Sequence, residues 1–137
     1  METDSLILFI RLAGGLHFGI LIASALVPQV LDWRRELRPL SIVTRQLVWV
    51  HGGFIVLTII GLGSIALIAA PDLAADTPLA RAVCGFITLF WGARLALQFV
   101  LFHPEALLTR WTLRAGYHGL TVVFAVIAAV FGYASFR

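Results

Sequence analysis

Four long apolar runs constrain this chain more than any other feature. They lie near 5–29, 46–70, 80–102 and 113–135. Each has about 20 residues or more, so a helix rising about 1.5 Å per residue would cross a hydrocarbon core about 30 Å thick. Three short connections and two stubs remain, which leave no room for a soluble domain. We therefore expect residues 1–137 to form a single membrane domain.

The overall composition agrees with a membrane location. Of the 137 residues, 61% are hydrophobic and only 12% are charged, whereas a soluble domain is about 45–50% apolar. Short connections return the chain to a neighbouring position, so we expect an all-α integral membrane protein folded as a four-span antiparallel up-down helical bundle. The single cysteine, Cys84, lies within the third run and has no partner in the chain for a disulfide.

The arginines predict how the chain is oriented in the membrane. All ten basic residues are Arg, and the second connection carries Asp72 and Asp76. The positive-inside rule therefore places the 31–45 and 103–112 connections in the cytoplasm and both termini on the non-cytoplasmic side of the cell membrane. We expect the first connection to anchor at anionic lipid headgroups and not to bind nucleic acid. Six arginines lie in or beside these two connections: Arg34, Arg35, Arg38, Arg45, Arg110 and Arg114.

Each apolar run carries one polar stripe when it is drawn as a helix at 100° per residue. Ionisable groups that face lipid are costly, so we expect the four stripes to face the interior of the bundle. The stripes are His17 with Gly14 and Ser24; His51 with Thr44 and Thr58; Trp91, Arg94 and Gln98 with Cys84 and Thr88 at the edge; and Arg114, His118 and Thr121.

The depth of each histidine limits which of them can meet. His51 lies six residues past Arg45 and His118 four past Arg114, so both are expected roughly 6–9 Å into the membrane from the cytoplasmic side. His17 is expected about 22 Å from that side. The three histidines therefore do not suit a zinc ion, whose ligands share one level. A haem can instead take its two axial ligands from facing helices.

Glycines flank His51 and His118, the two histidines that are expected at the same depth in the membrane. Gly52 and Gly53 follow His51, and Gly116 and Gly119 surround His118, which leaves room for a flat ring. In its general layout and at VHGG and YHGL, the sequence resembles small multi-span membrane proteins that bind b-type haem through helix histidines. The resemblance implies axial ligation of haem b by His51 and His118.

The resemblance also implies that Arg94 or Arg114 pairs with a haem propionate. His17 has no partner at its depth, so a second haem held by two protein histidines is not expected. The sequence HPE, residues 103–105, is either a surface metal pair or a solvated helix end.

A structural interpretation of the same residues stays open. Neutral imidazoles can hydrogen-bond to Thr58 or Thr121 in a polar core. No Asp or Glu occurs within the four runs, so Arg94 is expected to meet a propionate, another bound anion or a lipid headgroup, or to extend toward the cytoplasmic face beside Gln98.

Two function classes follow. The first is a haem-binding electron-transfer protein or oxidoreductase subunit; the second is a non-catalytic membrane subunit or small-ligand binder with a His/Arg polar core. The sequence contains no phosphate-binding glycine loop and no serine nucleophile motif.

Two further features concern the surface of the bundle. Gly15 and Gly19 form a GxxxG pair opposite His17, which is either a chance pair or a contact face for another helix in a homo-oligomer or larger membrane complex. Trp33, Trp49 and Trp111 lie near the expected cytoplasmic interface. We expect these tryptophans to act only as interfacial anchors in the lipid bilayer.

Overall fold

Four long helices make up most of the chain. The computed structural model describes residues 2–101 and 110–137. The long helices are α1 (Thr3–Val30), α3 (Ile42–Ile68), α5 (Pro78–Val100) and α7 (Trp111–Phe136). All four are long and apolar enough to cross a membrane, which confirms the expected multi-pass membrane protein.

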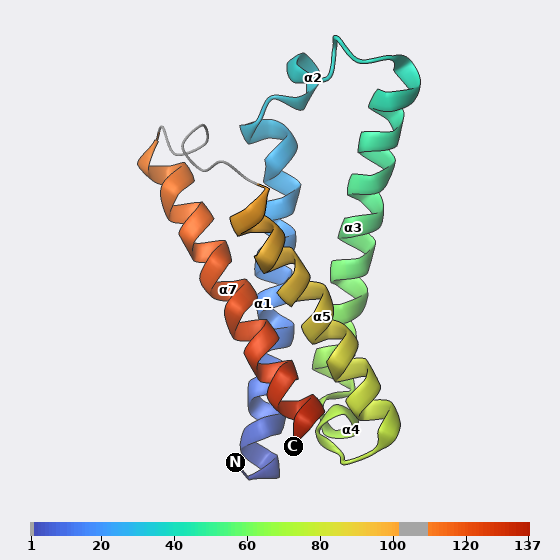
Figure 1. The fold of residues 1–137 in the computed structure, drawn as a ribbon, viewed down its shortest axis with the longest axis vertical. Coiled ribbons are helices and arrows are strands. Elements are labelled where there is room, and N and C mark those ends of the chain that lie inside the picture. Colours follow the sequence, from blue (N-terminus) through green and yellow to red (C-terminus); the bar gives the residue numbers. More distant parts are fainter. Residues whose placement is uncertain (1, 102–109) are drawn as a thin grey trace.

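The four helices run alternately up and down. Figure 1 shows both termini at the end that carries the short helix α4 (Ala70–Ala74), while the other short helix, α2 (Trp33–Glu36), lies at the opposite end. This arrangement confirms the four-span antiparallel bundle. The expected cytoplasmic connection 103–112 and its HPE sequence lie mostly outside the described residues, which resume at 110.

Side-chain caps determine where α3 and α5 begin. Both helices start a few residues earlier than hydropathy predicts. The Ser41 hydroxyl accepts a hydrogen bond from the Thr44 backbone N–H at 3.2 Å, so α3 begins at Ile42 and not at 46. The Thr77 hydroxyl accepts one from the Ala80 N–H at 3.1 Å, with a proline at the start of α5. Such caps satisfy N–H groups that a helix start leaves unpaired.

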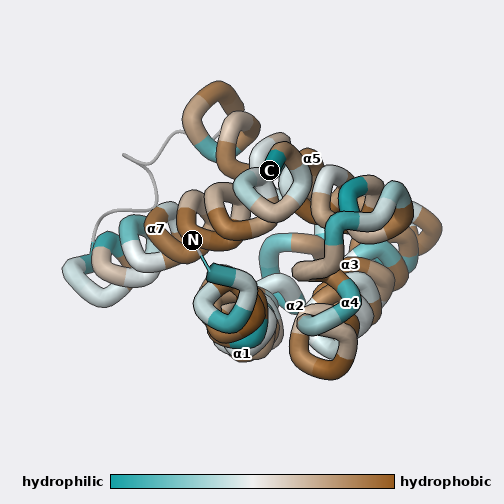
Figure 2. Tube along the Cα trace, turned by 90° about the horizontal axis from the view of Figure 1, so that it is seen from below, coloured by the Kyte–Doolittle hydropathy of each residue, from teal (hydrophilic) through white to brown (hydrophobic). Residues whose placement is uncertain are grey.

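The helices do not pack equally with all their neighbours. α1 packs along α3 and also contacts α7, and α5 packs along α7. α4 closes one end by packing against α1 and α5. Figure 2, seen from below along the bundle, shows α3 and α7 on opposite sides of α1. α3 and α5 are not packed along each other, so the bundle is least closed between these two helices.

The packed core lies in the half of the bundle that ends at α4. In the other half, residues 21–30 of α1, 42–58 of α3 and 111–123 of α7 include no buried side chain, and residues 92–100 of α5 include only the buried Gln98. The bundle therefore has a packed half at α4 and an open half at α2. The core residues of the packed half come from all four long helices: Leu6, Ile10, Ala13, Ile59, Leu62, Ala66, Cys84, Ile87, Ile127, Phe131 and Ala134.

A close approach between α1 and α3 depends on two glycines. A Cβ atom added at Gly63 would lie 2.9 Å from the Cβ of His17, and one added at Gly14 would lie 3.0 Å from the Cβ of Ala66. At Gly63 a larger residue would force its neighbours to shift, and at Gly14 the fit would be tighter than most Cβ contacts are. Gly15 and Gly19 are exposed, and a Cβ added at either would meet nothing within 4 Å. They face outward as expected, and a partner helix on them stays a prediction.

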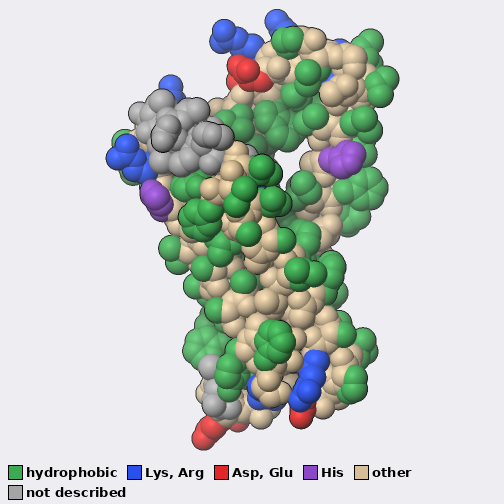
Figure 3. All heavy atoms as spheres, viewed as in Figure 1, with side chains coloured by type: hydrophobic (Ala, Val, Ile, Leu, Met, Phe, Trp, Pro, Cys, Tyr) green, Lys and Arg blue, Asp and Glu red, His purple; other side chains and the backbone are tan. Residues whose placement is uncertain are grey.

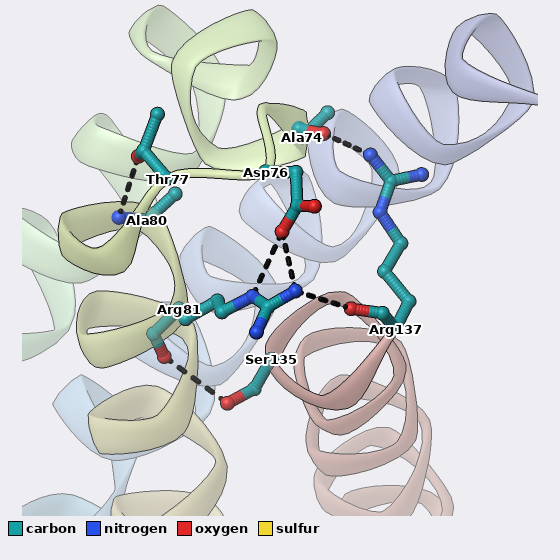
Figure 4. A network of polar contacts seen from close by, with 7 residues as sticks. All are labelled: Ala74, Asp76, Thr77, Ala80, Arg81, Ser135 and Arg137. Atoms are coloured by element: carbon teal, nitrogen blue, oxygen red, sulfur yellow. Dashed lines mark hydrogen bonds and ion pairs between the residues drawn. The ribbon is translucent and has the colours of Figure 1, made fainter.

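Polar contacts tie the end of α4 and the start of α5 to the end of α7 (Figure 4). Arg81 Nε donates a hydrogen bond to Asp76 Oδ1 at 2.8 Å, and Arg81 Nη2 donates to the Arg137 carbonyl at 3.0 Å. In return, the Ser135 hydroxyl donates to the Arg81 carbonyl at 3.1 Å, and the Arg137 guanidinium donates to the Ala74 carbonyl. Hydrogen bonds therefore reinforce the apolar packing of this half.

Candidate functional site

His17 joins α1 to α5 in the centre of the bundle. It is fully buried. Its Nδ1 donates a hydrogen bond to the Ala13 carbonyl at 2.8 Å, and its Nε2 accepts one from the indole N–H of Trp91 at 2.8 Å. An indole nitrogen can only donate, so the imidazole must be neutral with its proton on Nδ1. Both ring nitrogens are thereby engaged, and neither is open to a metal.

Aromatic rings continue from His17 toward α7. The Trp91 ring stacks on Phe124 with centroids 5.2 Å apart and an interplanar angle of 20°. The His17 ring meets Trp91 edge-on at 5.3 Å and Phe131 edge-on at 6.2 Å. Offset and edge-to-face rings of this kind add to the stabilisation that burial provides. On the side toward α2, the Trp91 and Phe124 rings form the floor of a cavity.

The cavity has a volume of about 470 Å³ and lies in the open half of the bundle. Its volume is within the range of about 300–1,000 Å³ that small-molecule sites occupy. Most of its walls are aliphatic or aromatic, and every long helix contributes to them. The lining residues are Ile20, Ala23, Ser24 and Val27 of α1, Trp33 of α2, Gly52, Ile55, Val56 and Ile59 of α3, Phe90, Trp91 and Arg94 of α5, and Leu120 and Phe124 of α7.

Arg94 gives the cavity its charge. Among the described residues, it is the only charged side chain that lines the cavity. Its guanidinium carbon lies 5.5 Å from the centre of the Phe124 ring, a distance that suits a cation–π contact. The ring helps to hold the guanidinium at the wall. A planar guanidinium offers paired N–H donors that match a carboxylate or phosphate, so the site has the chemistry to bind an anion.

The cavity opens sideways between α3 and α5. Ile55 lines it and is nevertheless 52% exposed, and Arg94 is also exposed. The space-filling view in Figure 3 is hollowed between α3 and the other helices, in the half that carries α2. This level lies within the four helices that are long and apolar enough to cross a membrane.

The predicted meeting of His51 and His118 does not occur. Both side chains are exposed, on α3 and α7, which are not packed along each other. His51 Nδ1 donates to the Leu47 carbonyl of its own helix at 2.8 Å, and the His118 ring lies 5.5 Å from that of its neighbour Tyr117. Figure 3 shows histidine side chains over α3 and over α7 on opposite sides of the view. The predicted inward orientation is therefore wrong for both, because the helices separate in the open half.

The remaining polar residues follow the expected stripes in part. Gln98 is buried and donates to the Thr121 hydroxyl, which donates to the Tyr117 carbonyl at 2.8 Å. This bond joins α5 to α7. Arg114, the other expected propionate partner, is exposed on α7 and does not line the cavity.

These positions do not fit a haem held between α3 and α7 of one chain. The two expected axial ligands lie on separate outer faces, and the nitrogens of His17 are both engaged. Within residues 2–101 and 110–137, no group of three or more His, Cys, Asp or Glu side chains is arranged to hold a metal ion. Haem ligation by this histidine pair stays a prediction without support from the geometry.

Trp33 is the site residue whose role the sequence did not indicate. It was expected to be an interfacial anchor, but it lines the cavity and meets Trp49 edge-on with ring centres 5.4 Å apart. A Cβ added at Gly52 would lie 3.7 Å from its ring. Nothing in the spacing of Trp33 distinguishes a cavity wall from an anchor, because its position depends on how the first connection folds back over α3.

Comparisons with models of protein families, with curated proteins and with solved structures find no match for this chain. The function proposed below is therefore based on the chemistry of the cavity and of Arg94. Among the described residues, that chemistry is a mostly apolar enclosure with the positive charge of Arg94 in its wall.

Proposed function

We propose that this protein binds, within the membrane, a small apolar molecule that carries a negatively charged group. The observation that carries the proposal is the position of Arg94 in the wall of an otherwise mostly apolar cavity. Opposite charges attract more strongly away from water, where the dielectric constant is low. This function corresponds to the small-ligand alternative that the sequence left open, with Arg94 as the residue that recognises the anion.

His17 supports this function without touching the ligand. Its bond to the Trp91 indole fixes the orientation of a ring that lines the cavity. Trp91 in turn stacks on Phe124, over which Arg94 lies. A chain of contacts thus runs from the packed half to the anion-binding residue, and it keeps the floor of the cavity in one shape.

The arginine-rich first connection indicates on which side of the membrane the site lies. Under the positive-inside rule, the end of the bundle at α2 faces the cytoplasm and both termini face outward. The cavity then lies in the cytoplasmic half of the cell membrane, and ligands would come from that leaflet. The same arginines would hold the α2 end at anionic headgroups.

A fluorescent anion provides a direct test. In protein with Trp49→Phe and Trp111→Phe, the two tryptophans that remain, Trp33 and Trp91, both line the cavity. Saturable energy transfer from them to 8-anilinonaphthalene-1-sulfonate would report occupancy of the cavity in detergent solution. We expect Arg94→Gln to weaken binding about tenfold or more, the effect of losing one charge-assisted hydrogen bond.

Two further variants control this titration. Arg94→Lys keeps the charge and should retain part of the affinity. Arg114→Gln removes an exposed arginine that does not line the cavity, so it should bind the dye as the parent does. Equal affinity of the parent and Arg94→Gln proteins would overturn the proposal.

The haem hypothesis has its own measurement. Protein purified from haem-replete cells would show the absorbance of a low-spin haem if His51 and His118 were axial ligands, and His51→Ala and His118→Ala would each abolish it. Such a result would favour an electron-transfer protein or oxidoreductase subunit. Colourless protein would remove that hypothesis and leave the anion-binding proposal in place.

A further inference from the structure

We infer that the ligand is a single-chain lipid carboxylate, such as a long-chain fatty acid, which enters the cavity sideways from the bilayer between α3 and α5. This inference rests on the proposed function and adds to it the class of ligand and the route of entry. Three aspects of the cavity carry it: where its walls are open, which polar groups it offers, and how deep its arginine lies.

The route follows from the walls. α1 packs along α3, and α5 packs along α7, which closes those two sides. Toward the α2 end, Trp33 lines the cavity and lies over Gly52, so the side nearest the headgroups is at least partly covered. Among the described residues, α3 and α5 do not pack along each other, and Ile55, which lines the cavity, is 52% exposed. We therefore place the way in between these two helices, on a side that would face lipid.

The floor determines where an apolar chain can lie. Trp91 and Phe124 are stacked and buried, and Ile59 beside them is only 2% exposed. Below them the helices are packed, so a chain cannot extend toward α4. Ile55 and Phe90, on the two sides of the opening, instead provide an apolar path outward. An acyl chain would lie along this path with its end among the lipids.

The polar groups of the cavity suit a carboxylate. The polar side chains among the described lining residues are Arg94, Ser24, Trp33 and Trp91, and the Trp91 N–H bonds His17. A carboxylate has two oxygens, which one guanidinium can bind side by side. A phospholipid head, with its phosphate, esters and glycerol, would bring more polar atoms than these groups can satisfy. Polar groups buried without partners are unfavourable.

The depth of Arg94 favours a ligand that is already in the membrane. Arg94 lies six residues before the end of α5 at Val100, which places it about 9 Å below that end of the helix. A water-soluble anion would have to leave the headgroup region to reach this level. A fatty acid lies at that boundary with its chain already in the hydrocarbon, so only its head has to move.

Brominated lipids test the ligand class and occupancy of the cavity together. Protein with Trp49→Phe and Trp111→Phe would be reconstituted into phosphatidylcholine vesicles, with 9,10-dibromostearic acid or its methyl ester added. Bromine quenches tryptophan fluorescence only at contact, so quenching of Trp33 and Trp91 reports a chain in the cavity. We expect the ionised acid to quench at about a tenfold lower mole fraction than the ester, and Arg94→Gln to abolish this preference.

Neighbouring glycines provide a matched pair of variants for occupancy of the cavity. Gly52→Phe would fill the cavity at its α3 wall, whereas Gly53→Phe would place the same ring on an exposed face where a Cβ meets nothing within 4 Å. The acid preference should be lost in the first and kept in the second, and Arg114→Gln should keep it as well. Circular dichroism of the vesicles would confirm that each variant is folded.

The outcomes separate this inference from the function on which it rests. Equal quenching by acid and ester, together with dye binding that still depends on Arg94, would overturn the fatty-acid inference and leave the proposed function intact. Dye binding that does not depend on Arg94 would overturn both. An acid preference that survives Gly52→Phe would overturn binding of the acyl chain in the cavity.

Discussion

His17 and His51 are the same residue type in the same kind of helix, but only one of them is part of the core. Each donates a hydrogen bond from Nδ1 to the carbonyl four residues earlier, at 2.8 Å in both cases. The difference lies at Nε2, which in His17 accepts the indole N–H of Trp91 from another helix. The bond at Nε2 therefore distinguishes the core histidine from the exposed one, whereas the bond at Nδ1 is the same in both.

Replacing His17 with leucine should destabilise the protein. The substitution keeps an apolar side chain of similar size but leaves the buried Trp91 N–H without its acceptor, which is unfavourable by about 1–3 kcal/mol. His51→Leu, at an exposed position, should change the free energy of unfolding by less than about 0.5 kcal/mol. Reversible unfolding in mixed micelles would measure both. Equal effects of the two substitutions would contradict a structural role for the His17–Trp91 bond.

The residues that the sequence placed correctly are those in the packed half or next to it. A helical wheel gives the direction of a side chain relative to its own helix, and it placed His17, Trp91 and Gln98 inside, as found. The same wheel failed for His51 and His118 because their helix segments have no buried side chain at all. Periodicity does not report where two helices diverge, so the cavity could not be predicted either.

At the scale of helices, the contact between α1 and α3 depends on backbone atoms. A Cβ added at Gly63 would lie 2.9 Å from the Cβ of His17 and 3.3 Å from the Gly14 carbonyl oxygen. Neither neighbour is the flexible end of a side chain. The two helices must therefore separate to accept any larger residue, and the His17–Trp91 bond would move with them.

The substitution Gly63→Ala should accordingly destabilise the bundle by about 1–3 kcal/mol, the usual effect of overpacking. Gly15→Ala provides the matched control, since a Cβ there meets nothing within 4 Å and alanine favours a helix by up to about 1 kcal/mol over glycine. Thermal unfolding of the two proteins in one detergent would give the comparison. A lower unfolding temperature for Gly15→Ala than for Gly63→Ala would contradict this account of the α1–α3 contact.

The whole molecule has two different ends. The α4 end carries both termini and the Arg81–Asp76 pair, and the α2 end carries an arginine-rich connection. Four spans, their antiparallel order and their approximate limits could all be predicted, because hydrophobic length is a property of consecutive residues. The unequal packing of the two ends could not be predicted, because it depends on contacts between distant residues.

The orientation in the membrane is open to a labelling experiment. A cysteine at Arg35 should react with a membrane-impermeant maleimide only from the cytoplasmic side, and one at Asp76 only from outside. Cys84 is buried and should not contribute to the signal, which the parent protein would verify. Labelling of the cysteine at Arg35 only from outside would show that the bundle has the opposite orientation in the membrane.

The depth of Arg94 also has an electrical consequence. A site about 9 Å into a hydrocarbon core about 30 Å thick lies about a third of the way across the membrane potential. Moving one charge through the full potential corresponds to about 2.3 kcal/mol per 100 mV. In the predicted orientation, an anion that reaches Arg94 from the cytoplasmic face would therefore gain about 0.7 kcal/mol per 100 mV of inside-negative voltage. Affinity should then rise about threefold at about 100 mV in vesicles polarised with valinomycin and a potassium gradient. In a bundle of opposite orientation the same voltage would weaken binding, so the sign of the effect reports which way Arg94 faces.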